Sequence, residues 1–372
     1  MKWLRASAFL LGLSALRAED RITPPLVVHE WGTITTRHTA DGTPEGRLNR
    51  IDSSEVLPAF VHRYEPPATQ GDSQRSLTKT TLTPGRPDVT MRLETPVIYF
   101  YPGAGARTPP FSVAVRFRGG ILNEFYPAAD GSVDVDVERV DAKMRAGLLH
   151  DWDGAVLDNY VVGGLRWRGL ALKPTVPLPS TDSHVWLAPR RVRASSVTEA
   201  NGESERYLFY RGVAHLDAVL QTRLAAGEVR LLAPARLHWL RTQSMTVSRV
   251  WLLHTRADGR SAFRERTNVT IARNEPSAEL ARTALFAESE YTPTGLGELR
   301  RSMKRALTEA GLFDDEAEAM LDTWRDSYFR APGLRVLYLV PNEWTSYFLP
   351  LKISVPTRLT RVLIGRIDLL DR

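Results

Sequence analysis

Three carboxylates lie where they could act in acid/base chemistry. Glu30 and Glu94 fall within runs of β-branched and aromatic residues, and Asp326 follows a run with helical spacing. Hydrolysis by a carboxylate pair needs the two groups roughly 5 to 10 Å apart across a cleft. Glu94 could form such a pair with Glu30, Asp326 or Glu124. The alternative is structural, with each carboxylate held by an arginine inside the fold.

Candidate binding residues accompany these carboxylates, namely His29, Trp31, Arg92 and Arg325. Because side chains alternate along a strand, we expect His29 and Trp31 to share one face while Glu30 points to the other. By the same rule, Arg92 and Glu94 share a face. Arg325 flanks the apolar face of a predicted helix, where it could contact a ligand or clamp the helix against the rest of the protein.

The sequence lacks common catalytic signatures. It contains no His-Glu-x-x-His, no Gly-x-Ser-x-Gly and no P-loop. Cysteine is absent, which excludes thiol nucleophiles, thiolate metal sites and redox motifs. The eight histidines are well separated, so we predict no metal site, and the sequence identifies no cofactor.

Tryptophan is the remaining chemical signal. A sheet that exposed Trp167, Trp186 or Trp239 could stack on sugar rings, whereas core packing is the default role of large aromatic residues. The partner that this pattern predicts is therefore a polysaccharide or a protein.

The elements that must position these residues are mostly strands. Alternating and β-branched runs, separated by Gly, Pro and Asn, predict an α+β fold dominated by antiparallel sheets, either sandwich-like or open and barrel-like. The predicted strands are 26–36, 91–101, 111–117, 121–126, 133–137, 160–172, 184–188, 206–210, 229–240, 249–254, 268–272, 335–340 and 361–369. Gly119-Gly120 predicts a tight hairpin between two of these strands.

The predicted domain organisation has three parts. Residues 1–18 combine Lys2 and Arg5, an apolar run and a small residue before an acidic pair, as in a signal peptide. Residues 19–275 form the β-rich body. Residues 276–372 follow the order helix, helix, strand, helix, strand and form either an appendage packed on the body or part of one continuous domain.

Charge and hydropathy also limit the classes of partner that the chain can be expected to bind. The 49 basic and 43 acidic residues give a formal net charge of +6, and removal of the leader leaves 46 basic residues. Because the arginines are scattered instead of clustered, we predict no nucleic-acid partner. No later stretch is apolar enough to span a bilayer, so the mature chain is expected to be periplasmic or secreted without an integral membrane segment.

Several strings resemble a group of uncharacterised bacterial proteins that are predicted to be exported. The distinctive ones are 29–33 (HEWGT), 94–101 (ETPVIYFY) and 323–327 (TWRDS), together with 335–341 and Gly365-Arg366. The resemblance covers most of the mature chain. It implies export and a single folding unit, and it implies no activity.

These observations favour an exported, non-catalytic binding or interaction protein. One alternative is a carboxylate-dependent hydrolase that acts outside the cytoplasm through Glu30 and Glu94. A second is a structural component of the cell envelope. The sequence leaves open whether the chain is an enzyme.

Overall fold

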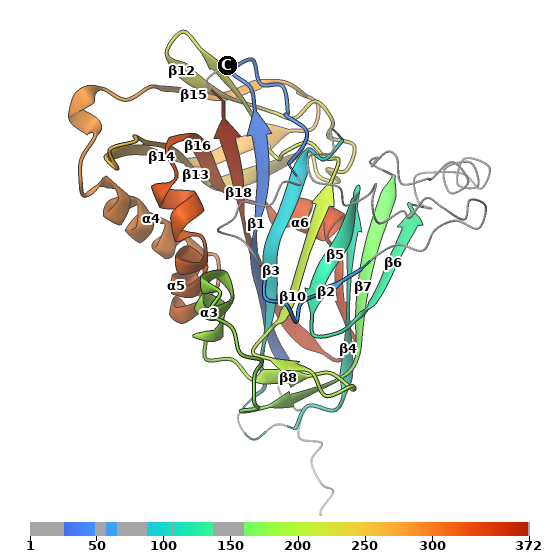
Figure 1. Ribbon diagram of the computed structural model, residues 1–372. Helices are drawn as coiled ribbons and strands as arrows, with labels where there is room; N and C mark the ends of the chain where they lie inside the picture. Colours follow the sequence, from blue (N-terminus) through green and yellow to red (C-terminus); the bar gives the residue numbers. More distant parts are fainter. Residues whose placement is uncertain are drawn as a thin grey trace, which may run out of the picture.

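The computed structural model describes residues 26–48, 57–64, 88–103, 105, 107–136 and 160–370. Strands dominate these residues and most strand pairs are antiparallel, so the chain is an α+β protein, as the sequence predicts. One large sheet holds most of the strands, and a three-stranded sheet lies beyond one end of it (Figure 1). In the described part, no helix has the length and apolar character needed to cross a membrane.

The main path of the large sheet has the order β14-β13-β16-β18-β1-β3-β10-β5-β7-β4-β17. Its strands are β1 (Leu26–His38), β3 (Met91–Tyr101), β4 (Phe111–Arg118), β5 (Gly120–Tyr126), β7 (Val161–Lys173), β10 (Leu208–Ala214), β13 (Ser244–Thr255), β14 (Ser261–Ala272), β16 (Gly333–Leu339), β17 (Leu351–Ile353) and β18 (Thr357–Leu369). Short strands join beside this path: β2 (His62–Arg63), β6 (Asp130–Val135), β8 (Ser196–Thr198) and β9 (Ser204–Glu205).

In the middle of the large sheet, the first and the last strand of the described chain lie side by side. β1 pairs in parallel with β18 along its whole length and antiparallel with β3 on its other side. β16 pairs with the opposite side of β18. The C-terminal strands therefore build the centre of the sheet together with β1.

A β-bulge in β3 changes which residues face each side. Trp31 of β1 pairs with Val97, but Thr33 pairs with Glu94, so β3 has one additional residue between these two pairs. Thr95 lies in this bulge with φ of 47°, a conformation that is uncommon for a β-branched residue.

Close packing accompanies the bulge. A Cβ atom on Gly32 would lie 2.9 Å from the Cα of Pro96, so glycine permits the approach of the two strands. Leu93 and Ile98 lie on opposite sides of the bulge in sequence, yet both belong to the same core cluster. Alternation along β3 is therefore reversed at Thr95.

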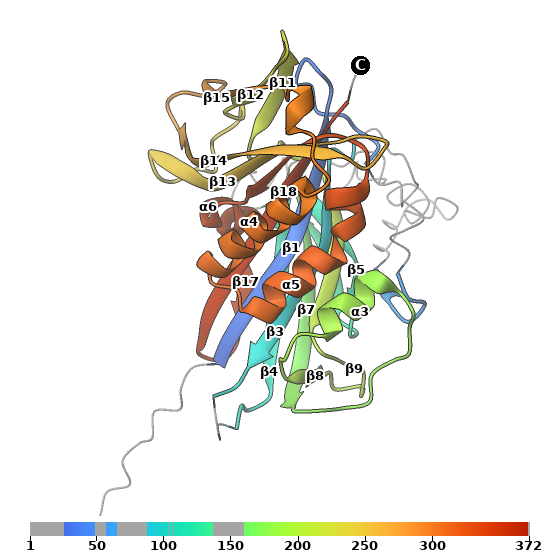
Figure 2. The same ribbon diagram turned by 90° about the vertical axis from the view of Figure 1, so that its left-hand side faces the viewer.

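The large sheet has an apolar cluster on each face. The "α6 face" packs against α6 (Asn342–Phe348), and its cluster includes Val28, Ile98, Tyr210, Trp344 and Leu363. The "helix face" packs against α3 (His184–Arg190), α4 (Gly295–Glu309) and α5 (Asp314–Thr323) (Figure 2). Its cluster includes Trp31, Val97, Phe209, Leu337 and Ile364.

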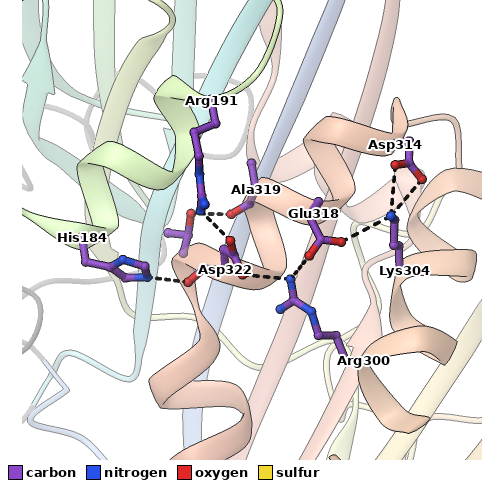
Figure 3. Close-up of polar contacts among 9 residues, drawn as sticks. His184, Arg191, Arg300, Lys304, Asp314, Glu318, Ala319 and Asp322 are labelled. Atoms are coloured by element: carbon purple, nitrogen blue, oxygen red, sulfur yellow. Dashed lines mark hydrogen bonds and ion pairs between the residues drawn. The ribbon is translucent and has the colours of Figure 1, made fainter. Parts of the chain in front are cut away.

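Ion pairs join the three helices of the helix face. Arg300 of α4 contacts Glu318 and Asp322 of α5, and Arg191, just after α3, also contacts Asp322. The Nε2 of His184 in α3 donates a hydrogen bond to the backbone oxygen of Asp322 at 2.8 Å. Figure 3 shows these side chains converging on α5. The network fixes the helices relative to one another, while the buried apolar residues beneath them hold the layer on the sheet.

The second sheet consists of β11 (Gln221–Ala225), β12 (Glu228–Leu232) and β15 (Glu279–Ala284). His38 at the end of β1 reaches it, because the Oγ1 of Thr222 in β11 lies 2.8 Å from the His38 Nδ1. A 3-10 turn (Glu288–Glu290) and a π-helical turn (Asp326–Arg330) complete the regular elements of the described residues.

Three local predictions were wrong. The predicted strand 229–240 ends at Leu232, because Pro234 follows and cannot donate to a sheet. Residues 184–188 form α3, since Val185, Trp186, Ala188 and Pro189 are buried with helical instead of alternating spacing. The predicted hairpin at Gly119-Gly120 is absent, because β7 lies between β4 and β5 in the sheet. The predicted order helix, helix, strand, helix, strand is present as α4, α5, β16, α6 and β18, and the structure adds β15 before it and the short β17 between α6 and β18.

Candidate functional site

Glu30 lies in a buried ion pair on the α6 face. Its Oε2 accepts a hydrogen bond from the Nε of Arg361 at 2.5 Å, and its Oε1 accepts one from the Tyr210 hydroxyl at 2.5 Å. The Glu30 side chain is fully buried and Arg361 is 8% exposed. Burial raises the pKa of the Tyr210 phenol, which therefore stays protonated and donates to Glu30. Both carboxylate oxygens of Glu30 are occupied.

Glu94 lies on the helix face, opposite Glu30. Its register partner is Thr33, whose hydroxyl lies 2.5 Å from that of Tyr328 in the helix-face cluster. Glu94 is 1% exposed and pairs with Arg92 at 2.8 Å. The hydrolase hypothesis requires Glu30 and Glu94 to line one cleft. The sheet separates them, so they do not.

His29 and Trp31 share the helix face, as alternation predicts. His29 Nδ1 lies 2.7 Å from Glu316 of α5, and the Tyr101 hydroxyl donates to the same carboxylate at 2.8 Å. Burial, with the Glu316 charge, raises the pKa of the Tyr101 phenol. Trp31 is fully buried in the core. His29 thus helps to dock α5 on the sheet, and Trp31 packs in the helix-face cluster.

Arg325 and Asp326 lie apart from the other predicted site residues. Their side chains are 43% and 51% exposed, and they contact each other at 3.8 Å. Asp326 also pairs with Arg330 within the same turn at 3.0 Å. Trp324 is buried, as expected, but the two charged residues form local surface pairs.

A band of charged residues crosses the helix face between β16 and β5. We define the "charged band" as seven residues on five strands: Arg335 of β16, Arg366 and Asp368 of β18, Arg92 and Glu94 of β3, Arg211 of β10, and Glu124 of β5. Register places them together, because Arg335 pairs with Asp368 and Arg211 pairs with Glu124. β1 runs through the band, where Thr33 lies opposite Glu94 and Thr35 lies opposite Arg92 in the strand register.

Arg335 fixes one end of the charged band. Its guanidinium donates to the backbone oxygens of Ser327, Tyr328, Ala331 and Pro332, at 2.6 to 3.2 Å. These carbonyls belong to the π-helical turn and the residues that follow it. Burial lowers the pKa of Arg335 to about 10, so the side chain remains a cation at neutral pH.

The charged band has more arginines than carboxylates. Four arginines face three carboxylates, and Arg211, Glu94, Glu124 and Arg335 are each buried. Buried charges are costly unless they are paired, and among the described residues the band's own side chains carry one more positive than negative charge. This arrangement suits the recognition of an anionic group better than proton transfer between two carboxylates.

The strings that carry the resemblance meet at the charged band. Thr33 comes from the first string and Glu94 from the second, and the Ser327 oxygen that Arg335 binds comes from the third. Arg335 and Arg366 belong to the two remaining segments. Arg211 lies in none of these strings, and its only sequence signal is that a lone charge interrupts the apolar run of β10.

The tryptophans do not form a sugar-stacking platform. Trp167 and Trp186 are at most 1% exposed and Trp239 is 5% exposed, so all three pack in the core. Among the described residues, no group of His, Asp and Glu side chains has an arrangement suited to a metal ion.

Comparison with known proteins adds no functional information. No protein-family model and no curated protein matches the sequence. Among solved structures, the Fcho1 Mu homology domain of Danio rerio with bound Eps15 peptide is similar over 94% of this chain and 96% of its own, at 8% identity and a TM-score of 0.28. A TM-score this low supports no conclusion about fold or function.

Proposed function

We propose that this chain is an exported, non-catalytic protein that binds an acidic partner through the charged band. The band's surplus of one arginine carries the proposal together with Arg63, which is 67% exposed and extends the positive charge beside Glu124 to solvent, because charge complementarity selects binding partners. Export is supported by the charge and apolar pattern of residues 1–18, which lie outside the described residues.

A protein is the favoured class of partner. The polysaccharide hypothesis relied on exposed indoles, and Trp167, Trp186 and Trp239 are buried. The charged band instead offers guanidinium groups, which bind carboxylates through paired hydrogen bonds. Acidic protein segments present such carboxylates at high density.

The two alternatives receive less support. The hydrolase hypothesis needs Glu30 and Glu94 in one cleft, and they lie on opposite faces in buried ion pairs. An envelope scaffold would be expected to have a broad apolar surface. The large apolar side chains that are exposed in the described part lie on separate elements: Leu187, Leu285, Phe313 and Leu359.

The test of the non-catalytic assignment is a turnover assay. Wild-type protein and the Glu94→Gln variant are incubated with panels of esters, glycosides and peptides, with Glu290→Gln as a control on an exposed carboxylate. We expect no turnover above buffer for any of them. Turnover by the wild type that Glu94→Gln abolishes, at an unchanged melting temperature, would overturn the proposal.

Export is tested separately by expressing the full chain in a bacterium and sequencing the N-terminus of the product. We expect cleavage close to Ala18 and recovery outside the cytoplasm. An intact N-terminus in the cytoplasmic fraction would contradict export without affecting the charged band.

A further inference from the structure

Arg211 is held differently from the other arginines of the charged band. Its closest polar contacts are the Thr95 hydroxyl at 3.5 Å and Glu124 at 3.6 Å. Its Nε has no hydrogen-bond partner among the described residues, although Arg211 is only 8% exposed. A guanidinium has five N–H donors, so a buried one with two distant contacts is poorly satisfied.

The other three arginines of the band are bound at short distance. Arg92 lies 2.8 Å from Glu94, Arg366 donates to Asp368 at 2.8 and 3.0 Å, and Arg335 binds four backbone oxygens. Outside the band, the Arg190 guanidinium donates three hydrogen bonds to the buried carboxylate of Glu205. Buried nitrogens without a partner also occur in Arg335 and Arg361, but each of these side chains makes at least one short hydrogen bond. Arg211 differs because both of its contacts are 3.5 Å or longer.

Glu124 is held equally loosely. It is 6% exposed and lies between two guanidiniums, that of Arg211 at 3.6 Å and that of Arg63 at 3.5 Å. Ionised groups normally form hydrogen bonds of about 2.7 to 2.9 Å, so both separations leave the charges of Glu124 and its two guanidiniums without a short direct hydrogen bond. Arg63 is 67% exposed, so this group of three residues reaches solvent through its side chain.

The charge of the group indicates what it would accept. Arg211 and Arg63 together carry two positive charges and Glu124 carries one negative charge, which leaves a single positive charge. A carboxylate, with one negative charge and two coplanar oxygens, balances this charge and matches the guanidinium fork. A phosphate dianion would leave an uncompensated negative charge beside Glu124.

We propose that Arg211 and Arg63 receive a carboxylate side chain of the bound partner, with the Thr95 hydroxyl as an additional polar contact. This inference rests on the proposed binding function and identifies the chemical group that the charged band recognises. Thr95 is in the bulge of β3 with a positive φ, and strained residues of this kind are frequent at ligand sites.

Calorimetric titration at low ionic strength, with a capped triglutamate peptide as the probe, tests the proposal. We expect the wild type to bind and Arg211→Gln to weaken the affinity by about 10-fold or more, because one charge-assisted contact is lost. Arg63→Gln is the second variant, since an exposed side chain can be changed without unfolding the protein, and it should weaken binding in the same direction. The control is Arg168→Gln, an arginine that is 66% exposed and paired with Asp130 on β6.

Inorganic phosphate and trigalacturonate are titrated in parallel. Phosphate binding as tight as that of the peptide, with the same dependence on Arg211, would overturn the carboxylate assignment. Tighter binding of trigalacturonate would favour a polysaccharide acid over a protein partner. Absence of peptide binding, or binding unchanged in both arginine variants, would overturn this inference. The turnover assay would still test the non-catalytic assignment independently.

Discussion

Buried carboxylates among the described residues are found in ion pairs with basic side chains. Glu30 meets Arg361 from the neighbouring strand, and both are removed from water. Such a pair contributes little net stability compared with apolar residues of the same size, because desolvation offsets the attraction. Loss of one member is costly, however, since the other charge then remains buried without a partner.

Glu30→Gln is therefore expected to destabilise the fold by about 3–5 kcal/mol, because the Arg361 charge would lose its counterion. Urea unfolding followed by tryptophan fluorescence measures the change. Glu290→Gln, at a carboxylate that is 34% exposed, should destabilise the fold far less, because solvent screens its ion pair with Arg264.

The double variant Glu30→Met/Arg361→Met tests whether the loss of stability comes from the unpaired charge or from altered side-chain packing. It should recover most of the lost stability, since neither charge then remains. If the single and double variants were equally unstable, the ion pair would not explain the effect.

At the scale of elements, the bulge in β3 limits what the sequence could predict. Strand positions followed from β-branched and aromatic runs, and the predicted limits of β3 are those in the structure. Strict alternation correctly placed Arg92 and Glu94 on one face. It could not place Glu94 relative to Glu30, because one additional residue at Thr95 reverses the facing and leaves no composition signal.

The band itself required long-range pairing that no local pattern encodes. Arg211 and Glu124 became neighbours through the pairing of β10 with β5. Arg335 and Asp368 met through the pairing of β16 with β18. Sequence reasoning found Arg92 and Glu94 because they lie two residues apart on one strand.

Arg335→Lys should loosen the π-helical turn specifically. Lysine keeps the charge but loses the planar fork that binds four carbonyl oxygens, so we expect a loss of about 2–3 kcal/mol. Hydrogen exchange should show earlier loss of protection at the Tyr328 and Ala331 amides than in β16. Arg330→Lys, at a side chain that is 67% exposed, serves as the control and should leave protection unchanged.

On the scale of the whole molecule, His38 links the two sheets. Its Nδ1 accepts hydrogen bonds from the hydroxyl and the backbone N–H of Thr222, so the bound form of the ring is neutral. Burial lowers the pKa of His38 from 6.5 to about 4, against a smaller opposing effect of Asp217. Between these two values the unfolded chain binds a proton that the folded chain does not.

Stability is therefore expected to fall as the pH drops from 6.5 towards 4, and His38 should account for about 2 kcal/mol of the loss by pH 5. The measurement is urea unfolding at neutral pH and at pH 5 for the wild type and for His38→Asn, which keeps an acceptor near Thr222. The variant should lose less stability over this interval. Equal losses in both proteins would assign the pH dependence to other groups.

The position of β18 has a consequence for biosynthesis. This strand occupies the place between β1 and β16, and it is made from residues 357–369. While a nascent chain is still being translated, β1 lacks its parallel neighbour and the centre of the sheet cannot close. Domains otherwise begin to fold from the N-terminus during synthesis. Here the order of strands delays closure of the sheet centre until residues 357–369 have left the ribosome, so β1 must wait for a partner made more than 300 residues later.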